Sequence, residues 1–327
     1  MSLWRISYRY TCRCVLLPLL VVLFFLPISS EANDARQPWA DELAGHFLTI
    51  ATGREYPTDS RNYVTTKWRS DENITYLIIG QADQAQRDIV RNHLVDLTKL
   101  TGLVFRDVSM EPIQVSPNPS TSALRQNPGE LLREFRFPDP LWGYARQGQH
   151  EVPGLVNNHL IRFVEGDQLI WWRAKLLILI TDKDSMNALG TQIGHESTME
   201  FGKGTIFCAG NFRGGVWSHP DPYLIRTASV FIPNVKSTLF SRCVVEELTQ
   251  VLGLPNDIPD SPITRFNERL DGPPELTIFD QLFLRILYNP TVTPGLAGEE
   301  LRALVVPLIE NELQRNPDLA RRPTGAR

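Results

Sequence analysis

The segment Ala174–Thr181 reads AKLLILIT, is almost wholly apolar, and follows Trp171–Trp172 with only Arg173 between them. Its apolar residues do not alternate with polar ones, which indicates a strand that is covered on both faces. We therefore expect this segment to be the central strand of a twisted sheet. We expect the tryptophan pair to pack at the start of that strand.

A strand, a helix and a second strand are predicted upstream of this segment. Asn73–Gly80 (NITYLIIG) is rich in β-branched and aromatic residues and ends in glycine, a pattern that predicts a strand. Gln81–Thr101 carries apolar residues at helical spacing, and Leu103–Val108 returns as a strand. A strand–helix–strand unit of about 35 residues predicts two parallel strands in one sheet.

The rest of the chain predicts one further strand and four helices around this sheet. Glycine-rich residues 187–215 predict long loops, and the proline-rich stretch at about 111–140 predicts an insertion. We expect an α+β fold with a single domain over residues 33–297, followed by a C-terminal helix and flexible tail over residues 298–327. The remaining predicted elements are a strand at Ile225–Ile232 and helices at Pro38–Thr52, Phe240–Leu254, Leu276–Tyr288 and Glu299–Leu313, the last with a break near Pro307.

Residues 1–32 have the composition of a secretory signal peptide. Arg5, Arg9 and Arg13 precede the apolar run Val15–Ile28, and small residues follow it. The run is about 14 residues long, whereas a spanning helix needs about 20. We therefore expect a bacterial protein that is exported to the periplasm or another extracytoplasmic space. An uncleaved N-terminal anchor is the alternative, and it would be the only attachment to a membrane.

Charge and cysteine content restrict the partners and the compartment. Three arginines and one glutamate leave with residues 1–32, so the formal net charge changes from −4 to −6. This acidic balance excludes nucleic acid as an expected partner. Cys12 and Cys14 also leave, so that only Cys208 and Cys243 remain. Two cysteines in an exported protein usually pair, and we expect a disulfide between them.

The segment Cys243–Asp257 reads CVVEELTQVLGLPND and contains the candidate site. On a helical wheel its apolar side chains form one face and its polar side chains form the other. Polar residues four positions apart lie above one another on that face. Gly253 permits a sharp exit from the helix, which brings the residues that follow back beside the same face. The side chains that we expect to converge there are Glu246, Gln250, Asn256 and Asp257.

The spacing in this segment resembles H-E-x-x-H-x-x-G-x-x-H/D, the zinc helix of the metzincin metalloproteases. The match covers Glu247, Gly253 and Asp257, and the predicted order of strands and helices is that of the zincin fold. A closer resemblance is to a bacterial family called domain of unknown function 2927. It extends roughly over Phe47–Leu296 and is carried by FLTIATGREY, CVVEELTQVLGLPND and RFNERLDGPPELTIFDQLFLRILYNPTVTPGL. These resemblances imply a zincin-like domain with a twisted mixed sheet and packed helices.

The metzincin resemblance places Glu246, Gln250 and Asn256 at the three metal-ligand positions and Glu247 at the position of the general base. One carboxylate and two neutral amides make a poor zinc site, because zinc in proteins is held mainly by His nitrogen and Cys sulfur. We therefore expect no zinc cofactor. Calcium or magnesium on the oxygens of Glu246, Asn256 and Asp257 is the alternative. A polar face whose side chains hydrogen-bond the following loop is the interpretation that we favour.

These observations predict a catalytically degenerate metalloprotease-like domain, and thus a protein that is not an enzyme. We expect it to act by binding a peptide or a component of the cell envelope. Two other classes stay open. The first is a hydrolase that uses Glu247 as general base with an atypical metal site. The second is a purely structural protein of the envelope.

Overall fold

The computed structural model describes residues 30–53, 64–111, 114–117, 159–165, 168–182, 208–214, 221–258, 261–267 and 274–322. The apolar run of the predicted signal peptide and most of the proline-rich stretch lie outside these ranges. The elements in chain order are α1 (Ser30–Thr52), β1 (Asn73–Gly80), α2 (Gln84–Thr101), β2 (Val104–Asp107), β3 (Gln114–Pro117), β4 (His159–Glu165), β5 (Gln168–Ala174), β6 (Leu176–Thr181), β7 (Ala209–Gly214), β8 (Ile225–Pro233), α6 (Thr238–Gln250), α7 (Ile278–Leu287), α8 (Gly298–Arg315) and α9 (Pro317–Ala320).

The main sheet has five strands in the order β2-β1-β6-β8-β7. Its strands run parallel except for β7, which pairs antiparallel with β8 at one edge. Every residue of β6 is buried, and the strand lies in the middle of the sheet. The prediction of a central apolar strand is therefore confirmed. The strand begins at Leu176 rather than Ala174, because the chain bends at Lys175, where β5 passes into β6.

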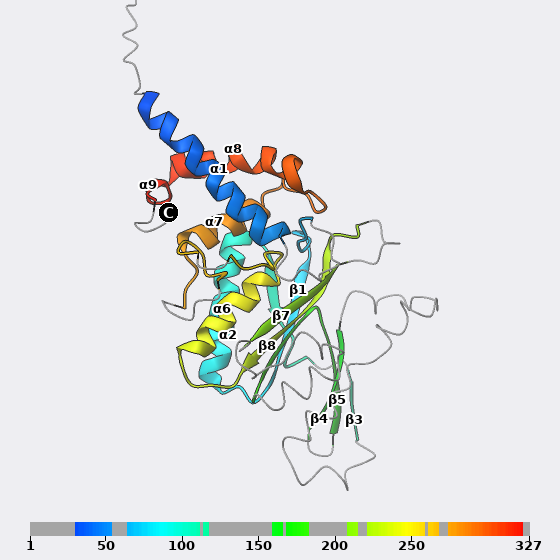
Figure 1. The fold of residues 1–327 in the computed structure, drawn as a ribbon. Coiled ribbons are helices and arrows are strands. Elements are labelled where there is room, and N and C mark those ends of the chain that lie inside the picture. Colours follow the sequence, from blue (N-terminus) through cyan, green and yellow to red (C-terminus); the bar gives the residue numbers. More distant parts are fainter. Residues whose placement is uncertain are drawn as a thin grey trace, which may run out of the picture.

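A second, antiparallel sheet of three strands has the order β3-β5-β4. It extends away from the helices in Figure 1, and β5 connects it directly to the central strand of the main sheet. The tryptophan pair Trp171–Trp172 lies in β5. The structure is thus an α+β fold in which one continuous stretch of chain, β5 followed by β6, contributes to both sheets.

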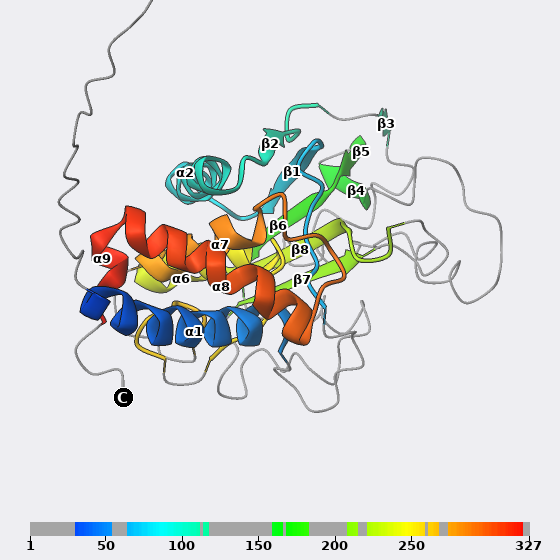
Figure 2. The same ribbon diagram turned by 90° about the horizontal axis from the view of Figure 1, so that it is seen from above.

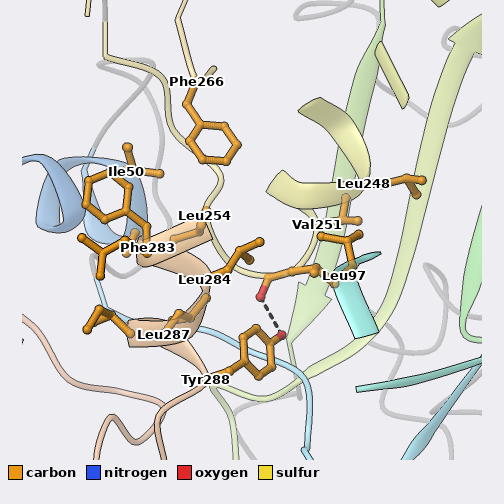
Figure 3. Packing of buried hydrophobic residues seen from close by; sticks show 14 of the residues in the cluster. Ile50, Leu97, Leu248, Val251, Leu254, Phe266, Phe283, Leu284, Leu287 and Tyr288 are labelled. Carbon is orange, nitrogen blue, oxygen red and sulfur yellow. Dashed lines mark hydrogen bonds between the residues drawn. The ribbon is translucent and has the colours of Figure 1, made fainter. Parts of the chain in front are cut away.

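The described helices lie together on one side of the main sheet (Figures 1 and 2). Helix α6 packs on β7 and β8, and α2 packs beside α6. The predicted contact face of α6 is confirmed, since Val244, Leu248 and Val251 are all buried in the core cluster. Figure 3 shows how Ile50 from α1 and Phe283 from α7 meet behind this face. The core therefore joins the N-terminal helix, the motif helix and the C-terminal helices.

Two segments that are predicted to be irregular contain strands. The glycine-rich stretch ends in β7, which includes Gly210 and Gly214. Pairing with β8 along one edge supplies backbone hydrogen bonds that do not require bulky side chains. A high glycine content alone therefore does not distinguish a loop from an edge strand. The proline-rich stretch includes β3, which pairs with β5 and ends at Pro117, where the missing N–H is tolerated at a sheet edge.

The terminal helices also differ from the prediction. Helix α1 begins at Ser30, so that Pro38 lies inside it, and α8 continues through Pro307 without a break. Helices α1 and α8 pack against each other, and this burial of apolar surface outweighs the hydrogen bond lost at a proline. The predicted tail begins with helix α9, where Leu319 is buried and its carbonyl accepts a hydrogen bond from the Trp39 indole at 3.0 Å. Within the described part of the chain, no helix has both the length and the hydrophobicity that crossing a membrane requires.

The buried side chain of Lys67 neutralises the C-terminal end of α7. Its ammonium donates to the carbonyl oxygens of Leu287 at 3.1 Å, Asn289 at 3.4 Å and Val292. The last carbonyls of a helix have no partner within the helix, and a buried cation satisfies them and the negative end of the helix dipole. Burial lowers the pKa of Lys67 to about 8. At pH 7 the side chain is therefore still charged.

Replacement of Lys67 by methionine keeps the aliphatic stem and removes the donors to these carbonyls. We expect Lys67→Met to lower the free energy of unfolding at pH 7 by about 3 kcal/mol, because it leaves buried carbonyls without partners. Urea unfolding followed by circular dichroism measures the change. The control is Lys236→Met, at a lysine that is 86% exposed, which should change stability by less than about 0.5 kcal/mol. Equal effects of the two substitutions would contradict the structural role of Lys67.

Candidate functional site

The motif helix α6 ends at Gln250, and Gly253 makes the turn that leaves it. Gly253 has a φ of +113°, and a Cβ on this residue would overlap the carbonyl oxygen of Thr66. Two donors from distant segments hold the carbonyls at this turn. The Trp68 indole donates to Val251 O at 2.9 Å, and the Tyr288 hydroxyl donates to Leu252 O at 2.9 Å (Figure 3). Gly253 therefore makes the sharp exit from the motif helix, at a position that has no room for a side chain.

Glu247 lies between α6 and the edge strand β7. Its side chain is 5% exposed, and a Cβ built on Gly210 would lie only 3.0 Å from Glu247 Oε2 and 2.8 Å from Val251 Cγ1. A Cβ here would crowd both side chains and would lie 3.2 Å from the backbone oxygen of Glu247, so glycine suits the close approach of the helix to the strand. Gly210 is not among the predicted site residues. It belongs to the glycine-rich stretch 187–215, whose glycine content was the one sequence feature that could have indicated a close backbone approach. The buried carboxylate of Glu247 thus lies close to Gly210 of β7.

The disulfide predicted between Cys208 and Cys243 is present and fixes the same contact. It joins the residue before β7 to the motif helix, with the two Cα atoms 5.7 Å apart. Cys243 is fully buried, whereas Cys208 is half-buried at the rim of the core. The disulfide and the close approach at Gly210 therefore lock the edge strand onto the helix that carries Glu246, Glu247 and Gln250.

The remaining candidate residues form two separate hydrogen-bonded sets. Gln250 Nε2 donates to Asp257 Oδ1 at 2.9 Å, and both side chains are half-buried, as is Glu246. Asn256 is 4% exposed, and its Nδ2 donates to the carbonyl of Ile50 at 2.9 Å. Its backbone N–H donates to the same carbonyl. Gln250 is thus linked to the loop after the helix, whereas Asn256 is linked to the end of α1.

The opposite side of α6 contacts a buried histidine of α2. His93 Nε2 lies 3.2 Å from Thr249 Oγ1, and Thr249 Oγ1 donates to Val245 O at 2.6 Å. With the threonine hydroxyl donating its proton to Val245 O, its oxygen accepts from the imidazole, and we assign the neutral tautomer with hydrogen on Nε2 on this basis. Burial lowers the pKa of His93 to about 4. The sequence pattern does not single out His93, which sits among the apolar residues of its helix.

The donor chemistry at the candidate site does not fit zinc. The amide nitrogens of Gln250 and Asn256 donate to protein oxygens, so each side chain has only a carbonyl oxygen left for a ligand. Zinc favours imidazole and thiolate over amide oxygen. Among the residues that the structure describes, no three His, Cys, Asp or Glu side chains are grouped so that they could hold a metal ion. We therefore derive no chemistry through zinc.

Residues 150–306 match the model of a family that is described as a protein of unknown function (DUF2927). The matched region begins before β4 and ends inside α8, and it includes β7, the motif helix α6 and the disulfide between them. This match supports the resemblance to the unknown-function family. Among curated proteins, none matches the chain.

Substitution of Gly253 tests whether the helix exit is as restricted as the structure indicates. We expect Gly253→Ala to lower the free energy of unfolding by more than about 3 kcal/mol, because a Cβ there is strained by the positive φ and overlaps Thr66 O. Gly102→Ala is the matched control. Gly102 also has a positive φ, of +74°, but a Cβ there meets no atom within 4 Å, so a cost of about 1 kcal/mol is expected. Thermal and denaturant unfolding measure both, and similar losses would contradict the packing described.

Proposed function

We propose that this chain is an exported, zincin-like domain without a catalytic zinc, and that it acts by binding an extended peptide segment of a partner or envelope component. The segment would lie along the outer edge of β7, beside the motif helix. The observation that carries this proposal is the edge strand itself, which a disulfide and the contact at Gly210 hold rigidly against α6. Calcium or magnesium at the polar face stays an untested alternative within the same proposal.

The order and direction of the elements support the zincin-like part of the proposal. Strand β1, helix α2 and strand β2 are followed by the apolar strand β6, and β8 leads directly into the motif helix α6. Strands β1, β2, β6 and β8 are parallel, and the helices α2 and α6 lie on the same side of the sheet (Figure 2). This is the order that the resemblance to the metzincin metalloproteases implies. The sharp turn at Gly253 agrees with it.

The position of β7 supports binding of an extended segment. Strand β7 is the last strand of the five-stranded sheet, and it is antiparallel to its one neighbour among the described strands. An extended peptide can add a strand to such an edge through main-chain hydrogen bonds, while side chains beside the edge give specificity. The half-buried side chains of Glu246 and Gln250 lie on the helix that packs under this strand. They are candidates for contacts with the peptide's side chains.

Two further observations support the compartment and the absence of catalysis. The disulfide is a feature of oxidising compartments, and it agrees with the apolar run that precedes α1. Glu247 is buried and packs against Gly210, whereas a general base must reach the proton that it removes. These observations favour a framework role for Glu247 over the competing role as base of a hydrolase.

Selection of peptides on the purified exported protein tests the binding function. From a random library of 12-residue peptides, we expect binders whose affinity falls at least about tenfold when alternate backbone amides are N-methylated, because strand addition depends on main-chain hydrogen bonds. Hydrogen exchange should show protection at β7. Failure to select any peptide, or binders that tolerate N-methylation and leave β7 unprotected, would contradict the proposal.

The same peptides separate binding from catalysis when Glu247 is substituted. If Glu247 has only a structural role, the dissociation constant of Glu247→Gln for the peptide stays within about threefold of the wild-type value, and neither the variant nor the wild type cleaves the peptide. If Glu247 is a general base, the wild-type protein cleaves the peptide and the substitution lowers the rate by about 10²–10⁴. Mass spectrometry of peptides after prolonged incubation distinguishes these outcomes. Circular dichroism of the variant serves as the control for folding.

Restoration of two imidazoles tests the zincin-like geometry independently of any peptide. Glu246→His/Gln250→His places two histidines one helical turn apart beside the loop that carries Asp257. Asp257 already accepts a hydrogen bond from residue 250, so it is placed to supply a third ligand. We expect zinc to bind this double variant with a dissociation constant on the order of micromolar or lower, measured by calorimetry at neutral pH.

The control for this variant adds Asp257→Asn, which replaces the carboxylate by a neutral amide of the same shape. It should weaken zinc binding at least about tenfold, because zinc binds carboxylate oxygen in preference to amide oxygen. Absence of zinc binding by the folded double variant would contradict a zincin-like exit at Gly253 that returns Asp257 to this face of the helix.

A further inference from the structure

We propose that the contact of His93 with Val245 and Thr249 is an acid-sensitive contact that holds the motif helix against α2, and that protonation of His93 releases this turn of the helix. The inference rests on the proposed function only in that the same turn carries Glu246 and Glu247. Its physical basis is independent of any ligand. His93, Val245 and Thr249 together form this acid-sensitive contact.

The neutral form of the acid-sensitive contact makes a continuous chain of hydrogen bonds from His93 through Thr249 to Val245. His93 is 8% exposed and Thr249 is fully buried. The imidazole donates from Nε2 to the Thr249 hydroxyl, and that hydroxyl donates in turn to Val245 O. One neutral tautomer thus satisfies a continuous chain of hydrogen bonds between α2 and α6. A buried polar contact of this kind is stable only while its groups stay paired.

A proton on His93 disturbs this arrangement. Protonation makes Nδ1 a second donor and places a positive charge between two packed helices. Burial lowers the pKa of His93 from 6.5 to about 4, and it outweighs two effects that raise the pKa, the charge of Asp96 and a hydrogen bond with the backbone of Val245. Asp96 lies on the same helix, is largely exposed, and already pairs with Lys99 at 2.7 Å. It therefore compensates the buried charge poorly.

Carboxylates on the neighbouring elements have other partners. On α6, Glu247 packs against Gly210 of β7, on the other side of that helix. On α7, Asp280 accepts from Thr264 and Thr277. On β2, Asp107 pairs with Arg91 at 3.0 Å. The parts of α6 that meet His93 are the backbone carbonyl of Val245 and the hydroxyl of Thr249, and neither of them is charged.

The direction of the pH dependence follows from linkage. Because the folded state binds the proton more weakly than the open state, the contact contributes its full stability above pH 6.5 and loses it as the pH falls towards 4. With these two pKa values, the equilibrium constant for opening rises about 30-fold between pH 8 and pH 5. Val245–Thr249 is one turn of α6, so its release also changes the position of Glu246 and Glu247.

Hydrogen exchange of the full exported protein tests the inference without a ligand. We expect the protection factors of the Val245–Thr249 amides to fall about 30-fold between pH 8 and pH 5 in the wild type. In His93→Gln, which retains a side-chain N–H donor but cannot titrate in this range, they should fall less than about threefold. The matched control is His46→Gln on α1. His46 is half-buried, and burial lowers its pKa although the charge of Glu42 opposes this effect. In His46→Gln, the protection factors of the Val245–Thr249 amides should fall between pH 8 and pH 5 as they do in the wild type.

A second measurement keeps the inference testable if His93→Gln does not fold. The NMR signal of the His93 ring in the wild-type protein should titrate well below pH 6.5. A pKa near 6.5 with unchanged protection of α6 would overturn the inference, and so would an equal loss of protection in wild type and His93→Gln. Because neither measurement uses a peptide, failure of peptide binding leaves this test unaffected.

Discussion

Two adjacent residues, Lys67 and Trp68, donate hydrogen bonds to buried carbonyls at the C-terminal ends of two helices, and the packing of the C-terminal half of the chain depends on this. Trp68 donates to the turn after α6, and Lys67 donates to the carbonyls at and beyond the end of α7. Helix ends leave backbone carbonyls without partners, and their burial is costly unless donors reach them. One short segment therefore allows both helix ends to be buried in the same core. It thereby stabilises both the sharp turn at Gly253 and the packing of α7 beside that turn.

The regular elements could be predicted because their patterns are local. The apolar run of β6, the strand–helix–strand unit and the apolar face of α6 are each contained in a short consecutive stretch. The donors from Lys67 and Trp68 are different, because they lie 183 or more residues from the carbonyls that they reach. No periodicity in the sequence relates residues at such separations. Their roles follow from tertiary structure, and they appear only when the fold is known.

Part of the candidate site could be predicted, because some of its residues are close together in the sequence. Residues on one helical turn, such as Glu246 and Gln250, are neighbours by geometry, and Asp257 lies close enough in sequence for the turn at Gly253 to return it to Gln250. Asn256 is adjacent to Asp257 in sequence, yet it bonds a carbonyl that lies 206 residues away. Consecutive residues in an irregular segment point in different directions, so the helical spacing that worked for residue 250 could not locate residue 256.

Helix α6 has polar contacts on two sides, and their chemistry differs. Towards β7, a glycine, a disulfide and a buried carboxylate fix the distance between helix and strand, and the covalent and steric parts of this contact do not depend on pH. Towards α2, the contact is a chain of hydrogen bonds through a histidine, which is neutral only above its own pKa. If acid weakens α6, it therefore does so first on the side of α2, while the disulfide keeps the helix joined to β7. The expected acid state is a local opening around one helical turn, with the edge strand and the helix still linked.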